Sequence, residues 1–258
     1  MNDPWVSVII PAYNEADRIP RTLQKISDFL QSRALPAEVI VVDDGSTDTT
    51  PQIVSQCSAK CATLRLLKNG RNRGKGFSAR HGLLEAKGKY VLLTDADLST
   101  PLEELDKLVQ ALESGGAVAA IGSRALDRSL VGTHQPWYRE SAGRFFNLLV
   151  RLVSGLPFHD TQCGFKLFLR EGARRAFELQ TVAGFGFDPE VLFLIRRLGG
   201  KIVEVPVRWN NSPASKVRFF RDSTRMFIDL IGIRSRAAWG RYNSRKSMRR
   251  SQEASFRE

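Results

Sequence analysis

Short apolar runs alternate with amphipathic stretches through the first half of the chain. The runs are rich in Val, Ile and Leu, which is typical of buried strands, and the stretches between them have helical spacing. Strands are predicted at residues 5–10, 38–42, 64–68, 90–94 and 117–121, and helices at 18–31, 50–59, 77–86 and 101–113. Because continuously apolar strands alternate with helices, we expect an α/β fold with a mostly parallel sheet and helices on both faces.

The pattern is less regular in the second half. Helices are predicted at residues 138–154 and 189–198, and strands at 166–169 and 201–207. Residues 217–239 are basic and amphipathic, and the polar, basic residues after 242 have the composition of a disordered tail. We therefore divide the chain into an α/β domain of residues 1–215, a basic amphipathic helical segment of residues 216–242 and a tail of residues 243–258.

Polar or glycine-rich segments follow four of the predicted strands. The carboxyl ends of parallel strands meet at one edge of a sheet, where ligands bind in folds of this class. We therefore expect these four segments to lie together and to form the functional site. They are Pro-Ala-Tyr-Asn-Glu at 11–15, Asp-Asp-Gly-Ser-Thr-Asp at 43–48, Asn-Gly-Arg-Asn-Arg-Gly-Lys-Gly at 69–76 and Asp-Ala-Asp at 95–97.

Asp95 and Asp97 are candidates for metal binding. Residues i and i+2 of an extended chain point to the same side, so the two carboxylates form half of a site for a hard cation. Ligand phosphates and water would complete the coordination shell. The alternative is a solvated turn that caps the following helix, but the three neighbouring ligand-like loops favour the metal site.

Two further loops are candidates for binding a phosphorylated ligand. Residues 70–76 form a flexible basic loop that could cradle phosphates, and Asp43 and Asp44 could bind a base or a ribose. A solvated loop and an Asx turn are the respective alternatives. The loop is not a Walker motif, because Lys75 is followed by glycine, and no Gly-x-Gly-x-x-Gly follows the first strand. Dinucleotide oxidoreductases are therefore disfavoured.

Residues 6–15, 41–46 and 95–97 together resemble the inverting nucleotide-sugar glycosyltransferases of family 2, which have the GT-A fold. Further matches resemble the polyprenyl-phosphate sugar transferases, most nearly the dolichyl-phosphate β-glucosyltransferase group and next the dolichyl-phosphate mannose synthases. These matches are Gly-Ser-Arg at 122–124, Asp-Thr-Gln-Cys-Gly-Phe-Lys at 160–166 and Glu-Val-Pro-Val-Arg-Trp at 204–209. The segment at 160–166 is the most selective of them. The Gln-x-x-Arg-Trp signature of processive family members is not found, which favours transfer of a single sugar.

The resemblance implies a Rossmann-like GT-A domain and a role for each matched residue. The implied nucleotide-sugar-binding residues are Pro11, Ala12, Tyr13, Asn14, Glu15, Asp43, Asp44, Lys75, Asp95 and Ala96. Asp95 and Asp97 would hold Mg²⁺ or Mn²⁺ against the diphosphate. The implied acceptor-phosphate-binding residues are Arg124, Arg144, Ser215, Lys216 and Arg218, and the implied catalytic residues are Asp97, Asp160 and Arg124.

The same resemblance implies the reaction. Glucose would pass from UDP-glucose to a polyprenyl phosphate of the dolichyl or undecaprenyl type. A phosphate monoester has a second pKa of about 6, so the acceptor is already an anionic nucleophile at neutral pH and needs little help from a general base. GDP-mannose or UDP-GlcNAc as donor and a soluble acceptor are the alternatives.

The charge of the chain points to an anionic surface. The net charge is +12, and residues 216–258, with twelve basic and four acidic residues, contribute eight of these charges. Residues 143–153 and 217–239 mix large apolar and basic side chains, as do helices that lie on anionic lipid, although core helices with a charged outer face are equally compatible. No stretch reaches the ~20 apolar residues that span a bilayer.

We therefore expect a peripheral protein on the cytoplasmic face of a membrane. We expect no nucleic-acid partner, because motifs such as a helix-turn-helix or a zinc knuckle are not found and the acidic loops would repel a phosphate backbone.

Overall fold

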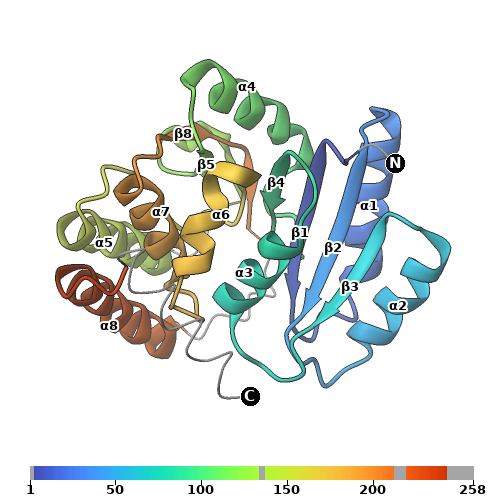
Figure 1. The fold of residues 1–258 in the computed structure, drawn as a ribbon, viewed down its shortest axis with the longest axis horizontal. Coiled ribbons are helices and arrows are strands. Elements are labelled where there is room, and N and C mark those ends of the chain that lie inside the picture. The colour runs from blue at the N-terminus through green and yellow to red at the C-terminus, as the bar shows by residue number, and fades with distance from the viewer. Residues whose placement is uncertain (1–2, 134–136, 212–218, 243–258) are drawn as a thin grey trace.

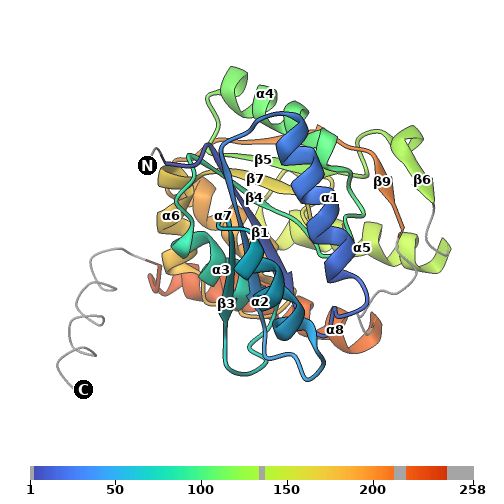
Figure 2. The same cartoon turned by 90° about the vertical axis from the view of Figure 1, so that its right-hand side faces the viewer.

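The computed structural model describes residues 3–133, 137–211 and 219–242, with side chains left out at 133–142, 144–146 and 219–223. A seven-stranded sheet with the order β3-β2-β1-β4-β7-β5-β8 forms its centre (Figure 1). Its strands are β1 Val6–Ala12, β2 Ala37–Asp43, β3 Leu64–Lys68, β4 Tyr90–Leu93, β5 Ala119–Ser123, β7 Lys166–Leu169 and β8 Ile202–Pro206. β6 (Val131–Thr133) and β9 (Trp209–Asn210) form a small second sheet, seen at the right of Figure 2 above α5.

The described residues contain eight α-helices. They are α1 Ile19–Ser32, α2 Thr50–Lys60, α3 Lys75–Glu85, α4 Leu105–Gly115, α5 Trp137–Ser154, α6 Arg170–Leu179, α7 Phe187–Arg197 and α8 Phe219–Ala238. Two short 3₁₀ turns, Leu102–Glu104 and Arg128–Leu130, precede α4 and β6. The predicted strands and helices of the first half are confirmed, with boundaries that differ by a few residues. The predicted helix at 101–113 begins as one of these 3₁₀ turns.

The two faces of the sheet are covered by different helices. Along β1, Val8 and Ile10 pack with apolar side chains of α1 and α4, whereas Ile9 packs with those of α3, α6 and α7. This alternation follows from the two-residue period of a strand, because successive side chains point to opposite faces. The predicted three-layer α/β architecture is therefore confirmed.

β7 departs from the parallel arrangement. It runs antiparallel between β4 and β5, and Lys166 at its start is paired with Leu93 and Ile121. The chain therefore enters β7 at the edge where β4 ends. Residues 160–165, which precede β7, therefore lie at the carboxyl edge of the sheet, beside the loops predicted to form the site.

α6 was not predicted from the sequence. Its first residues are mostly charged, and its buried residues are Ala173, Ala176, Phe177 and Leu179. α8 confirms the predicted C-terminal helix. Its inner face packs Met226 and Leu230 into the core, next to α5 and α7. No helix within the described ranges combines the length and the apolar character that crossing a membrane requires.

A buried ion pair joins β7 to the first turn of α7. Lys166 Nζ lies 2.6 Å from Asp188 Oδ1 and also donates to the carbonyl oxygen of Cys163. Both charged side chains are buried. Burial raises the pKa of Asp188, although the charges of Lys166 and Lys75 oppose this shift. The pair fixes the segment that leads into β7 against a helix on the other side of the site.

We predict that Lys166→Met lowers the free energy of unfolding by about 3–5 kcal/mol at pH 7, because it leaves the buried Asp188 carboxylate without its partner. Urea unfolding followed by circular dichroism measures the change. Lys201→Met is the matched control, since Lys201 is exposed and its loss is expected to cost less than about 0.5 kcal/mol. Equal stability of the Lys166→Met variant and the unmodified chain would contradict this account.

Candidate active site

The loops that follow β1 and β2 are bound to each other. Asn14 has a φ of +54° and its Oδ1 accepts a hydrogen bond from the backbone N–H of Thr47 at 2.8 Å. Its own N–H donates to Ser46 Oγ, and the N–H of Glu15 donates to Thr50 Oγ1. Asn tolerates the left-handed conformation better than most residues, which explains its place in this turn. The predicted Pro11–Glu15 segment is therefore held at the carboxyl edge of the sheet.

Asp43 and Asp44 organise the neighbouring loops. Asp44 is buried, and its carboxylate accepts hydrogen bonds from the backbone N–H groups of Arg73 and Gly74 at 2.9 and 2.8 Å. Asp43 Oδ1 accepts from the N–H of Ser46 at 3.2 Å, as in the Asx turn considered from the sequence. A role for either residue in base or ribose binding stays a prediction. The anchoring of the basic loop by Asp44 was not predicted, because its partners are backbone groups that sequence patterns do not show.

The loops after β2 and β3 also approach each other closely, and both lie at the lower edge of the sheet in Figure 1. Gly45 has a φ of +73°, and a Cβ at this position would lie 2.4 Å from the carbonyl carbon of Arg71. Glycine is therefore required here both by the backbone conformation and by the space.

In the Asp-Ala-Asp segment, the two aspartates are partly exposed and the alanine between them is buried, as predicted. Ala96 is buried, and Thr22 Oγ1 donates to its carbonyl oxygen, whereas Asp95 and Asp97 remain 37% and 22% exposed. Asp95 Oδ1 lies 2.5 Å from Lys75 Nζ. Asp97 Oδ1 accepts from the N–H of Ser99 at 3.0 Å. Asp95 thus contacts the basic loop that follows β3, whereas Asp97 Oδ2 lies 4.0 Å from Arg18 Nη1.

Gly164 lies directly against Asp95. A Cβ on Gly164 would be only 2.0 Å from Asp95 Oδ2, a distance that no real side chain tolerates. Gly164 belongs to the selective segment at 160–166, which β7 brings to this edge by its antiparallel direction. The glycine is therefore explained by close approach of the backbone to a carboxylate.

Arg124 and Asp160 form a bidentate ion pair. Arg124 Nε and Nη2 donate to the two carboxylate oxygens of Asp160 at 2.6 and 2.9 Å, and the Arg124 backbone N–H donates to Oδ2 at 3.1 Å. Burial alone would raise the pKa of Asp160, but the charge and hydrogen bonds of Arg124 lower it to about 2. Asp160 is therefore ionised at neutral pH and fixes the plane of the guanidinium.

Residues 204–209 support this pair. Glu204 Oε1 accepts from the backbone N–H of Asp160 at 2.7 Å, and the Arg124 guanidinium lies 5.4 Å from the ring centre of Trp209. The three segments at 122–124, 160–166 and 204–209 therefore meet in space, although they are far apart in the sequence. Glu204 was not assigned a role from the sequence, because a single acidic residue in a strand carries no signal.

A sequence profile described as Glycosyl transferase family 2 matches residues 7–177, which is more than half of the chain. This chain belongs to glycosyl transferase family 2. The resemblance drawn from its loop motifs is thereby confirmed, and the chain is a glycosyltransferase.

Known proteins of the family match over most of the transferase. A dolichyl-phosphate β-glucosyltransferase of Dictyostelium discoideum is 36% identical over 92% of this chain and 76% of its own length. The one of Drosophila melanogaster is 38% identical over 92% and 75%. The solved mannosyltransferase PcManGT from Pyrobaculum calidifontis, in complex with GDP-Man and Mn²⁺, has a TM-score of 0.55 and 25% identity. The match covers 84% of this chain and 59% of that one, and it confirms the GT-A fold.

The donor set of the transferase fits a hard divalent cation whose shell is completed by a ligand. Asp95 and Asp97 offer partly exposed carboxylate oxygens, the type of ligand that Mg²⁺ and Mn²⁺ take. In the described ranges, no cluster of three or more His, Cys, Asp or Glu residues could hold a metal by itself. Phosphate oxygens and water would have to provide the remaining ligands, as they do at many Mg²⁺ sites.

The other predicted residues fall outside this geometry. Ser215, Lys216 and Arg218 lie outside the described residues, as does the side chain of Arg144. Their predicted contact with an acceptor phosphate stays a prediction.

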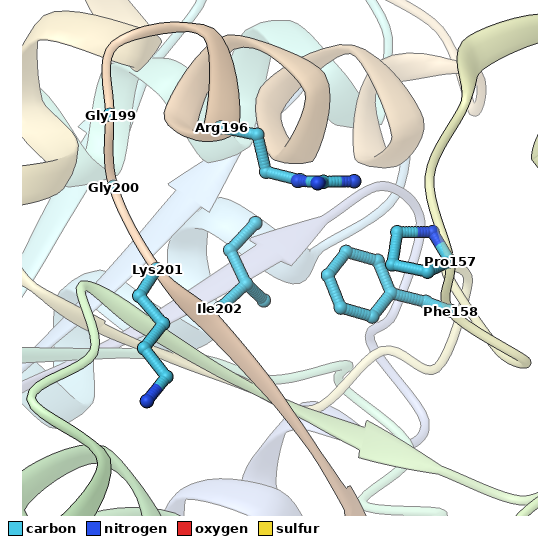
Figure 3. Close-up of a pocket in the computed structure, with 7 residues that line it drawn as sticks. All are labelled: Pro157, Phe158, Arg196, Gly199, Gly200, Lys201 and Ile202. Atoms are coloured by element: carbon cyan, nitrogen blue, oxygen red, sulfur yellow. The ribbon is translucent and has the colours of Figure 1, made fainter.

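A separate cavity of about 370 Å³ lies at the amino end of β8. It is lined by the end of α7, the turn that follows it and residues 157–158 (Figure 3). Arg196 at its rim donates to the carbonyl oxygen of Gly155. None of the predicted site residues lines this cavity, so we do not assign it to the reaction.

We predict that Gly164→Ala weakens the binding of Mn²⁺ together with a nucleoside diphosphate by tenfold or more, because the new Cβ must displace the Asp95 carboxylate. Isothermal titration calorimetry measures the affinity, and the melting temperature tests folding. Gly143→Ala in α5 is the control, since nothing lies within 4 Å of its Cβ position. Unchanged affinity in a folded Gly164→Ala variant would refute the close contact.

Proposed function

We propose that this glycosyltransferase moves glucose from UDP-glucose to the phosphate of dolichol or a related polyprenol. The observation that carries the proposal is the similarity of nearly the whole chain to dolichyl-phosphate β-glucosyltransferases of distant organisms. The likeness to a mannosyltransferase solved with GDP-Man makes GDP-mannose the donor against which UDP-glucose has to be tested.

The carboxyl edge has groups suited to the donor. The loops after β1 and β2 would contact the nucleoside, and the basic loop would contact the diphosphate. Asp95 and Asp97 would hold Mg²⁺ or Mn²⁺, which offsets the negative charge that develops on a diphosphate leaving group. The acidic pair alone would repel the diphosphate, so a cation is needed for the two to lie together.

Arg124 is suited to the acceptor. In an inverting transfer, a phosphate oxygen of the acceptor forms a bond to the anomeric carbon while the bond from that carbon to the diphosphate oxygen breaks. The acceptor is already anionic, so the protein has to hold it in line rather than remove a proton. A guanidinium matches phosphate oxygens well, and Asp160 would keep Arg124 oriented for this contact.

α5 and α8 would bring the site to the membrane that contains the acceptor. The two helices contact each other and lie side by side in Figures 1 and 2. α8 also reaches the site, since Gln162 Nε2 lies 3.9 Å from Met226 Sδ. Six of the nine large apolar side chains exposed within the described residues lie on these helices or just after α8. They are Leu148, Leu152, Phe227, Ile228, Ile231 and Trp239.

Basic residues border this apolar surface. Arg151 of α5 and Arg225 and Arg234 of α8 are exposed. Exposed apolar side chains flanked by arginine fit the boundary between lipid headgroups and acyl chains of an anionic bilayer. We therefore extend the proposal to peripheral binding of the transferase at the cytoplasmic face of a membrane, with residues 1–215 as the catalytic domain.

We predict that UDP-glucose with a polyprenyl phosphate gives the highest rate in a screen of UDP-glucose, UDP-GlcNAc and GDP-mannose, each with and without the lipid. Asp97→Asn should lower that rate by a factor on the order of 10²–10³, as loss of a group that stabilises developing charge does. Transfer of radiolabelled sugar to the lipid phase measures both results.

Asp106→Asn is the matched control for this substitution, because Asp106 is an exposed residue of α4 that pairs with the exposed Arg33. Preference for GDP-mannose would replace the donor in the proposal. Transfer to a soluble acceptor alone would replace the lipid, and full activity of a folded Asp97→Asn variant would remove the metal assignment.

We predict that the transferase sediments with anionic liposomes and that binding weakens as salt is raised, because attraction between exposed charges is screened. Ile228→Asp should reduce the bound fraction at least severalfold, since Ile228 is 62% exposed on α8. Leu198→Asp is the control, because Leu198 is 45% exposed after α7 and outside the α5–α8 surface. Equal losses for both variants, or no sedimentation at low salt, would argue against this surface.

A further inference from the structure

The ammonium of Lys75 is placed on one of the two carboxylates assigned to the metal. Its Nζ lies 2.5 Å from Asp95 Oδ1, which is ion-pair distance with a charge-assisted hydrogen bond. A divalent cation bound to the same carboxylate would lie only a few ångströms from the ammonium. Two positive charges at such a separation repel each other strongly in a partly buried site.

The backbone holds Lys75 firmly in this place. Asp44 accepts hydrogen bonds from the N–H groups of Arg73 and Gly74, just before Lys75. On the other side, a Cβ on Gly76 would lie 2.5 Å from Phe187 Cβ, so this turn packs tightly against the start of α7. The first residue of α3 is therefore fixed, and only the flexible side chain of Lys75 can change partners.

Several acidic groups act on this ammonium. Burial lowers the pKa of Lys75, but the charges of Asp95, Asp188 and Asp97 more than offset this effect and leave the pKa raised. A lysine is positively charged at neutral pH at its ordinary pKa of about 10.4, and Lys75 is no exception. Asp188 has its own partner in Lys166, so Asp95 is the carboxylate that depends on Lys75.

We propose that the Lys75 ammonium is the internal counter-cation of Asp95. A metal ion must displace this ammonium from Asp95, and the ammonium then pairs with the diphosphate of the donor. This inference rests on the metal assignment made under the proposed function. It makes Lys75 a coupling residue between the two ligands. Metal alone binds weakly, because it has to replace a charge that is already paired. Metal with diphosphate binds tightly, because the displaced ammonium gains a new anionic partner.

The coupling must be reciprocal. If UDP raises the affinity for Mn²⁺ by some factor, Mn²⁺ raises the affinity for UDP by the same factor. Removing the charge of Lys75 should therefore increase the affinity for Mn²⁺ alone and decrease the coupling factor. A lysine that only bound the diphosphate would weaken UDP binding and leave the affinity for Mn²⁺ alone unchanged.

The test is a titration of the full chain with Mn²⁺, followed by electron paramagnetic resonance of the free ion, with and without UDP and again with GDP. Lys75→Met and Lys75→Gln remove the charge and keep much of the side chain, and Lys75→Arg keeps the charge. Lys89→Met is the matched control, because Lys89 is an exposed lysine just before β4, at the opposite edge of the sheet. Circular dichroism confirms that each variant is folded.

We expect Lys75→Met and Lys75→Gln to bind Mn²⁺ alone on the order of tenfold more tightly than the unmodified chain. UDP should then add less to the Mn²⁺ affinity than it does in the unmodified chain. Lys75→Arg and Lys89→Met should stay within about twofold of the unmodified chain. Unchanged or weaker Mn²⁺ binding in both neutral variants, or tighter binding in Lys75→Arg or Lys89→Met, overturns the inference.

Asp95→Ala separates this inference from the proposed function. If Asp95→Ala binds Mn²⁺ with UDP as the unmodified chain does, the metal assignment is wrong and the inference falls with it. If Asp95→Ala loses that binding while the neutral Lys75 variants bind Mn²⁺ alone no more tightly than the unmodified chain, the metal assignment stands and only the counter-cation role is refuted. No acceptor is present, so the result does not depend on which lipid the enzyme uses.

Discussion

The structure depends on the need to neutralise carboxylates that are crowded at one edge of the sheet. Asp160 and Asp188 are buried there, and each is paired with a cation from a different part of the chain. An unpaired charge in such a place costs several kcal/mol, so breaking either pair would also release the segments that it joins. The pairs therefore fix residues 160–166 to β5 on one side and to α7 on the other, and they do so at the place where ligands would bind.

The antiparallel direction of β7 brings this segment to the site. In a sheet of parallel strands only, the residues before a strand lie at the amino edge, away from the ligand-binding loops. Because Lys166 is paired with the last residue of β4, the residues before it lie at the carboxyl edge instead. One reversed strand therefore adds a fifth segment to the four loops, and Gly164 allows that segment to approach Asp95.

The sequence predicted the elements that have a local periodic pattern. It did not predict the features that depend on contacts between residues far apart in the chain. The strands of the first half could be predicted because burial on both faces of the sheet makes them continuously apolar. The partly exposed Asp95 and Asp97 on either side of the buried Ala96 could be predicted from the two-residue period of an extended chain. The direction of β7 could not be predicted, since a four-residue apolar strand pairs equally well either way. α6 was missed because its first residues are mostly charged and only two of its four buried residues are large and apolar. Glu204 and Asp188 act through partners tens of residues away, which no single-sequence pattern reveals.

Two ion pairs at the same edge differ in exposure, and this difference separates their roles. Asp160 is 2% exposed, and its carboxylate also accepts the backbone N–H of Arg124, so exchange of partners would leave a buried charge. That pair therefore holds the Arg124 guanidinium in a fixed orientation. Asp95 is 37% exposed and meets the end of a flexible lysine. Water and ligands can reach it, so its lysine partner can leave without stranding a buried charge. Burial thus separates a fixed ion pair at Asp160 from an exchangeable one at Asp95.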